Sequence, residues 1–346
     1  MLESLLEMAL EKKEEILNKL DEFYDPELDP QEKWISQNIK ITPDKMVLSA
    51  GDGSIHKKKF LSFIFYAISA ETLIYKEELQ KIENSQIDLI PHHRFVEDRL
   101  RNYMSLYEIK NALQALEKGV DYYLFDGSLL GNLIRPFPLD KELKTKTKRE
   151  IEEKYRYPLE KELDNNLVEI SSSHFADDSN KNMESLIYLE NLESLLVIKK
   201  LLDYGKKLVT ISKTSTRNDY FGSNIPDISL FDGSNKKEGY SHPHYLKVSS
   251  QLKREFPILD NYLREKEFTI FYARLEDYKN IIKIELPYRA SAEEMKNVLG
   301  MLKRDSVEGY PYLLKKAHHD VVIKKTDLDR LSAIMGFLEK DGREML

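Results

Sequence analysis

Residues 45–54 read KMVLSAGDGS, and residues 122–130 read YYLFDGSLL. In both segments an apolar run leads into Asp-Gly-Ser, so we predict one buried strand with Asp52 at its carboxyl end and another that ends at Asp126. If these strands are neighbours in one sheet, the two aspartates project into a common crevice at the sheet edge. A third Asp-Gly-Ser, at residues 232–234, lies in a segment that follows a loop.

Two aspartates at one sheet edge indicate a cation site. Carboxylates that are held together raise each other's proton affinity, and a divalent cation removes their repulsion. Magnesium and manganese prefer oxygen ligands, and such a site can activate water for phosphodiester hydrolysis. The glycine beside each aspartate leaves room for a phosphate to approach the backbone. Because Asp-Gly-Ser is also a common turn sequence, the alternative is that these triplets are only structural.

The surrounding sequence predicts an α/β fold with a mixed sheet that helices flank. Residues 59–75 are rich in Phe, Ile, Tyr and Ala, and we expect a second and a third strand there, which return antiparallel. Ser291 and Glu294 form a capping box that opens a helix. The other expected elements are helices at 95–118, 183–204 and about 326–339, a strand at 208–212, and a hairpin of 268–274 with 280–286.

We expect a single domain over residues 1–346. Residues 1–22 have apolar positions at helical spacing and predict an amphipathic helix, which we expect to pack on the domain rather than to serve a partner. Residues 140–185 begin with a segment dense in Lys and Glu, and we interpret them as a charged helical insertion.

Composition excludes several classes of site. The chain has no cysteine, which excludes disulfides, thiolate zinc sites and cysteine nucleophiles. It has no long apolar run and no signal-peptide pattern, so we expect no membrane association and a cytoplasmic location. The net charge of −7 argues mildly against nucleic-acid binding, although basic residues can gather in a groove. Without a P-loop, movement along DNA would require a separate motor.

Three segments together resemble a known family. LSAGDGS at 48–54, YYLFDGSLL at 122–130 and GYPYLLKKAHHD at 309–320 are similar to the NurA nucleases, and the resemblance extends over nearly the whole chain. It implies an RNase H-like fold, a manganese-dependent nuclease (magnesium being the alternative metal), and a homodimer. It also implies action on single-stranded DNA and duplex ends, as an endonuclease and a 5′–3′ exonuclease in double-strand break resection, beside a HerA-type hexameric translocase.

The resemblance also implies a set of site residues. Asp52 and Asp126 match the two family aspartates, and the family glutamate corresponds to Glu108, with Glu97 as the competitor. The third aspartate corresponds to Asp227, or else to Asp232. The histidine of the Ala-His element corresponds to His318, or else to the adjacent His319. Lys213 matches a basic residue that could contact the scissile phosphate or balance the carboxylates.

Two other functions remain open from the sequence. In the first, the chain is a non-catalytic dimeric adaptor for a DNA motor, and the Asp-Gly-Ser triplets are purely structural. In the second, a similar carboxylate cluster serves a metal-dependent phosphatase or nucleotidase. Metal binding and a comparison of DNA with small phosphate esters would separate these functions from a nuclease.

Overall fold

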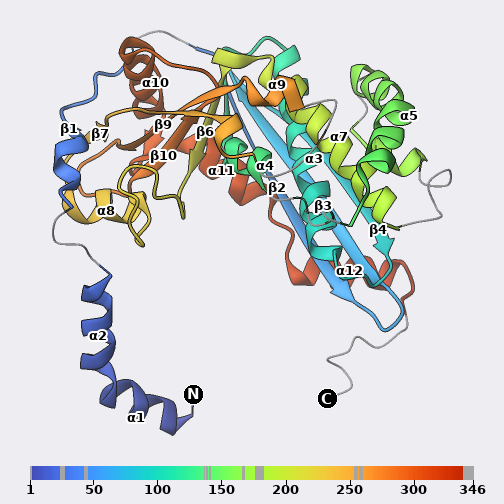
Figure 1. Ribbon diagram of the computed structural model, residues 1–346, viewed down its shortest axis with the longest axis horizontal. Helices are drawn as coiled ribbons and strands as arrows, with labels where there is room; N and C mark the ends of the chain where they lie inside the picture. The colour runs from blue at the N-terminus through green and yellow to red at the C-terminus, as the bar shows by residue number, and fades with distance from the viewer. Residues whose placement is uncertain are drawn as a thin grey trace.

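A ten-stranded mixed sheet forms the centre of the protein, in the strand order β1-β7-β9-β10-β6-β5-β2-β3-β4, with β8 paired to β9. It is seen in a computed structural model that describes residues 2–23, 28–42, 46–135, 137, 139, 142–165, 168–175, 183–252, 256 and 260–337 (Figure 1). The strands are β1 (Trp34–Ser36), β2 (Leu48–Lys59), β3 (Ile64–Tyr75), β4 (Leu79–Ile90), β5 (Tyr122–Asp126), β6 (Leu208–Ser212), β7 (Gly239–Ser241), β8 (His244–Lys247), β9 (Glu267–Arg274) and β10 (Ile282–Leu286).

Strands β2, β3 and β4 form an antiparallel meander, and β5 and β6 then continue the sheet in parallel with β2. The predicted mixed sheet is therefore confirmed. The prediction that two strands lie within residues 59–75 is wrong, because β3 alone occupies residues 64–75. The third strand is β4, whose residues are mostly exposed. An edge strand needs little apolar sequence, so its polar composition concealed it.

The other half of the sheet contains the expected hairpin. Strands β9 and β10 pair antiparallel, with Ile284 opposite Phe271. Strand β10 also pairs with β6 and so joins the two halves of the sheet.

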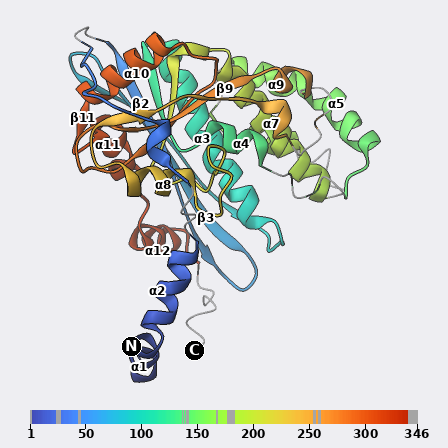
Figure 2. The ribbon, with the colours of Figure 1, turned by 60° about the vertical axis from the view of Figure 1, so that its left-hand side comes forward.

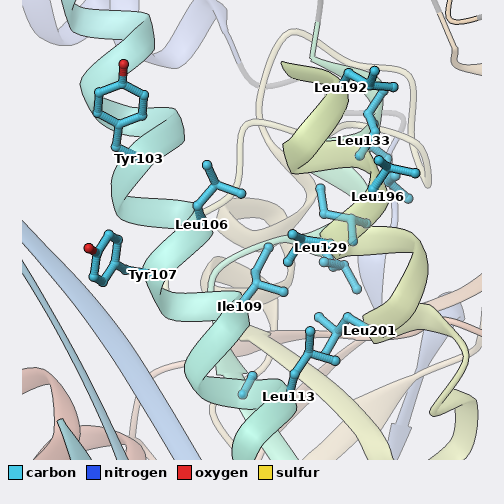
Figure 3. Packing of buried hydrophobic residues seen from close by; sticks show 14 of the residues in the cluster. Tyr103, Leu106, Tyr107, Ile109, Leu113, Leu129, Leu133, Leu192, Leu196 and Leu201 are labelled. Carbon is cyan, nitrogen blue, oxygen red and sulfur yellow. The ribbon is translucent and has the colours of Figure 1, made fainter. Parts of the chain in front are cut away.

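Helices cover both faces of the sheet. One core cluster joins α3, α4 and α7 to the meander, and Figure 3 shows leucines of α4 and α7 lying against Leu106, Ile109 and Leu113 of α3. A second cluster joins α10 and α11 to the central strands. The main helices are α3 (Val96–Glu117), α4 (Leu129–Ile134), α5 (Thr145–Asp164), α7 (Met183–Leu202), α8 (Asp227–Ser234), α9 (Asp260–Arg264), α10 (Ala292–Arg304), α11 (Tyr312–Val321) and α12 (Lys325–Ile334).

Several smaller features complete the fold. The capping box of Ser291 and Glu294 at the start of α10 is confirmed. A small sheet pairs β11 (Ser306–Val307) with β12 (Tyr310–Pro311). No helix in the described ranges combines the length and the apolar composition that a bilayer crossing requires. The 3-10 helices are η1 (Pro30–Lys33), η2 (Ser171–Phe175), η3 (Gly205–Lys207) and η4 (Val248–Ser250).

The amino-terminal segment does not pack on the domain. It forms two helices, α1 (Glu3–Glu11) and α2 (Lys13–Glu22), which project away from the sheet in both views (Figures 1 and 2). Their apolar side chains, such as Leu5, Ile16 and Leu20, are exposed. Our expectation of packing was therefore wrong, because helical periodicity shows that a helix has an apolar face but does not show what covers it.

Candidate metal centre

Asp52 and Asp126 occupy equivalent places on two adjacent parallel strands. The last paired residues of β2 and β5 are Gly51 and Phe125, so each aspartate comes one residue after the paired region. Neighbouring strands lie about 4.8 Å apart, which brings the two carboxylates into one site. The condition stated from the sequence, that the two strands are neighbours in one sheet, is met. The prediction that the first strand ends at Asp52 is wrong, because β2 continues to Lys59 through its pairing with β3.

The turn after Asp126 is held by a buried network. Gly127 has a φ of 112°, a conformation that favours glycine. Ser128 caps α4 by accepting from the Gly131 amide at 2.8 Å, and its hydroxyl donates to Glu285 at 2.6 Å. Glu285 on β10 is fully buried and also accepts from Lys283 at 2.5 Å. This network fixes the position of the Asp126 backbone, and nothing in the local sequence around Glu285 indicated its role.

A histidine from the opposite end of the sequence completes a three-residue group. His318 on α11 lies with its Nδ1 2.5 Å from Oδ2 of Asp52. One ligand atom from each of Asp52, Asp126 and His318 lies within 4.8 Å of the others. Helix α11 is held near this site because the amide of Ile323, just after the helix, donates to the Ser54 hydroxyl of β2 at 3.0 Å. The serine of the first Asp-Gly-Ser thus has a positioning function.

Glu108 approaches the group from α3. A Cβ at Gly53 would lie 3.0 Å from Met104 and 3.5 Å from the Cβ of Glu108, so this glycine allows the helix to pack closely on the strand. Burial, together with the charges of Asp52 and Asp126, raises the pKa of Glu108 well above its usual range. Burial also raises the pKa of Asp126, with a further contribution from Asp52, while Lys213 lowers it.

The donor set fits a divalent cation. Glu108 Oε1 is buried and has no hydrogen-bond partner within the described part of the chain, and an unpaired buried carboxylate oxygen is costly unless a cation or proton satisfies it. Carboxylates, which make up most of this donor set, are ligands that suit both manganese and magnesium. Asp52, Glu108, Asp126 and His318 would hold such an ion, and its charge would favour the ionised carboxylates.

Lys213 and Tyr310 border this group. Lys213 directly follows β6, and its Nζ lies 3.3 Å from Asp126 Oδ2 and 4.7 Å from the centre of the Tyr310 ring. The Tyr310 hydroxyl is buried and has no hydrogen-bond partner among the described residues. Burial and the charges of Asp126 and Asp52 raise the pKa of Tyr310. The sequence patterns gave Tyr310 no role, although it lies in the Tyr-Pro…Ala-His segment that carried the resemblance.

The structure does not bring Asp227 into this group. Asp227 is the first residue of α8, is completely buried, and accepts the amide of Tyr220 at 3.1 Å. Asp232 is bound by Arg274 at 2.6 Å, and the third Asp-Gly-Ser forms the end of α8 instead of following a strand. The metal ligand expected in this segment is therefore not placed at the site.

Glu97 and His319, the two other alternative site residues, interact with side chains outside the group of Asp52, Asp126 and His318. Glu97 forms an ion pair with Lys57, which lowers the pKa of Glu97. His319 points its Nδ1 toward Asp320 at 3.3 Å, and its side chain is 89% exposed. The geometry therefore favours Glu108 and His318 over these two alternatives.

Asp227 should make the stability of the protein depend on pH. Burial raises its pKa from 3.8 to about 6, so its contribution to stability is complete below about pH 4 and is lost as the pH rises through about 6. We expect Asp227→Asn to raise the melting temperature above that of the wild type at about pH 8 and to leave it unchanged at about pH 4. Manganese affinity should stay the same, and its loss would show that Asp227 reaches the metal.

Comparison with known families identifies the family of this chain. The family model described as NurA domain matches residues 46–323. This chain belongs to the NurA family. The matched range begins just before β2 and ends just after α11, so it contains Asp52, Glu108, Asp126 and His318. The family predicted from the three motifs is confirmed.

Curated NurA proteins resemble the chain over nearly its full length. A probable DNA double-strand break repair nuclease NurA from Methanocaldococcus jannaschii is 31% identical, covering 99% of this chain and 92% of that protein. The DNA double-strand break repair nuclease NurA from Saccharolobus solfataricus is 29% identical, covering 95% of this chain and 89% of that protein. Both names describe a nuclease, which is the class of enzyme predicted from the sequence.

Solved NurA structures share the fold. The NurA nuclease from Sulfolobus solfataricus superposes with a TM-score of 0.77 at 23% identity, with 97% of each chain covered. A NurA structure bound to dAMP and manganese superposes with a TM-score of 0.72 at 19% identity, with 98% of each chain covered. The predicted α/β mixed sheet with flanking helices is therefore confirmed as the NurA fold.

Proposed function

We propose that this protein is a manganese-dependent deoxyribonuclease that processes DNA ends at double-strand breaks, with magnesium as the alternative metal. The observation that carries this proposal is the group of Asp52, Asp126 and His318, with the unpaired buried carboxylate of Glu108 beside it. The names of the NurA relatives support a DNA substrate.

The proposed roles of the residues follow from their positions. Asp52, Asp126, Glu108 and His318 would hold a divalent cation, whose chemistry would be to lower the pKa of a water and to offset charge on the leaving oxygen. Lys213 is exposed on one side and lies next to Asp126, so it can donate to a phosphate oxygen and offset the negative charge there. Tyr310 supports the Lys213 ammonium by a cation–π interaction. Asp227 has no part in this proposal.

The proposed activity is tested with purified full-length protein on labelled single-stranded DNA. We expect cleavage in manganese, and no cleavage after the metal is chelated, because without a cation nothing would lower the pKa of the attacking water or offset the charge on the leaving oxygen. Small phosphate esters serve as the comparison substrate. Turnover of the esters with intact DNA would favour a phosphatase, and manganese binding without cleavage of either substrate would contradict an enzymatic role.

Other features of the proposal concern the cellular setting. We propose single-stranded endonuclease and 5′–3′ exonuclease activity in the cytoplasm, within a homodimer that works beside a HerA-type hexameric translocase. The chain has no P-loop, so a separate ATPase would supply the force. The exposed apolar side chains of α1 and α2 offer a surface that such an assembly could cover.

A further inference from the structure

A cavity of about 340 Å³ lies between α3, α4 and α7, beside the group of Asp52, Asp126 and His318 that we call the metal-binding group. Glu108 and Asp126 line one part of it, and Arg101 and Arg135 line another. Met104, Phe125 and Ile187 contribute apolar surface. Binding sites for small ligands measure roughly 300–1,000 Å³, so this cavity accepts one nucleotide but is too small for a base-paired duplex.

The two arginines are incompletely neutralised. Among the residues that the structure describes, Arg101 has one ion-pair partner, Asp98, at the long distance of 3.9 Å. Arg135 makes no ion pair with any residue in the described ranges, although Asp98 acts on it electrostatically. Partial burial and the nearby charge of Arg101 lower the pKa of Arg135. Two guanidinium groups that share one distant carboxylate leave a surplus positive charge, which an anion would balance.

The cavity lining therefore carries both signs of charge, and on α3 Arg101 lies about two helical turns from Glu108. A cation held by Glu108 and Asp126 would attract the phosphate that is to be cut, while the arginines would attract a different phosphate. A single DNA strand carries phosphates on both sides of each nucleoside, which matches this separation of charge. The apolar residues between the two regions suit a sugar or base better than another charged group.

We propose that Arg101 and Arg135 bind the phosphate adjacent to the scissile one in an unpaired DNA strand, with the intervening nucleoside in the cavity. This inference rests on the proposed nuclease function. The arginines are binding residues here, and their planar guanidinium groups can donate paired hydrogen bonds to phosphate oxygens. The need for an unpaired strand follows from the size of the cavity.

The test measures DNA affinity without catalysis. A fluorescein-labelled single-stranded oligonucleotide is titrated with protein in a chelator, and anisotropy is recorded over a range of salt concentrations. We expect the double variant Arg101→Ala/Arg135→Ala to bind about tenfold more weakly or worse. The slope of log affinity against log salt should fall by about 0.7 for each phosphate that the variant no longer neutralises. Arg135→Lys keeps the charge and should retain most of the slope.

Arg149→Ala is the matched control, because Arg149 is an exposed arginine on α5 outside this cavity. It should leave the affinity and the salt slope within about twofold of the wild type. Thermal melting verifies that each variant is folded. An equal loss of affinity in Arg149→Ala and the double variant, or an unchanged slope in the double variant, would overturn the inference.

Manganese-dependent cleavage by the wild type is assayed in parallel. In the double variant, the KM for DNA should rise by a larger factor than kcat falls, because the arginines hold the strand without touching the reacting atoms. Wild-type cleavage with unchanged binding by the variants would reject the cavity assignment and leave the nuclease function intact. A wild type that neither binds nor cuts DNA would reject both.

Discussion

Asp52→Asn is expected to reduce manganese-dependent DNA cleavage about a thousandfold, which corresponds to about 4 kcal/mol of transition-state stabilisation. Asp52 is in contact with His318 and lies one strand from Asp126. The amide keeps the shape of the side chain and removes its charge, so the proposed cation would lose a ligand and the remaining carboxylates would hold it less firmly. Cleavage rates of single-stranded DNA at saturating manganese measure the effect.

Asp232→Asn is the matched control for this prediction. Asp232 stands in the same Asp-Gly-Ser sequence but forms an ion pair with Arg274 away from the metal-binding group. Its replacement should change the cleavage rate by less than about twofold, although it can lower stability, because Arg274 is buried. Equal losses in the two variants, or near-wild-type activity in Asp52→Asn, would contradict the assigned site.

Glu108→Gln is expected to lower activity about a hundredfold and, at the same time, to stabilise the metal-free protein. The folded-state pKa of Glu108 is raised by burial and by the two aspartates, so the folded protein holds this proton more tightly than the unfolded chain. Stability is therefore lost as the pH rises above the ordinary glutamate range. The glutamine variant avoids that loss, so its advantage should appear at about pH 8 and disappear at about pH 4.

Glu193→Gln is the control with the same substitution and similar burial. Glu193 on α7 accepts from Lys110 at 2.7 Å and from the amides of Ser171 and Ser172. Removing its charge leaves the buried Lys110 ammonium with the Glu169 carbonyl but without its counter-charge, and should destabilise the protein by about 3 kcal/mol. Melting temperatures with and without manganese measure the stabilisation expected in Glu108→Gln and the destabilisation expected in Glu193→Gln. A metal-free Glu108→Gln protein that melts below the wild type at about pH 8 would contradict the repulsion that we infer between Glu108 and the two aspartates.

Local sequence patterns predicted the two site residues that belong to strands, Asp52 and Asp126. An apolar run followed by Asp-Gly-Ser indicated strands at Asp52 and Asp126, and both occur. The same triplet at residues 232–234 ends a helix instead, which shows that the triplet alone does not specify its surroundings. The difference lies in pairing partners, since β2 and β5 lie against each other and α8 does not belong to the sheet.

The sequence by itself determined the mixed α/β fold, the paired aspartates and, through three motifs, the NurA family. Only the tertiary structure brings His318 next to Asp52, Glu108 beside the two aspartates and Asp227 into a separate buried position. It alone shows the positions of Tyr310 and Glu285 and the cavity lined by Arg101 and Arg135. The physical reason is distance along the chain. Periodicity and turn chemistry act over a few residues, whereas His318 reaches Asp52 across 266 positions, and such a contact depends on how complete helices pack on the sheet.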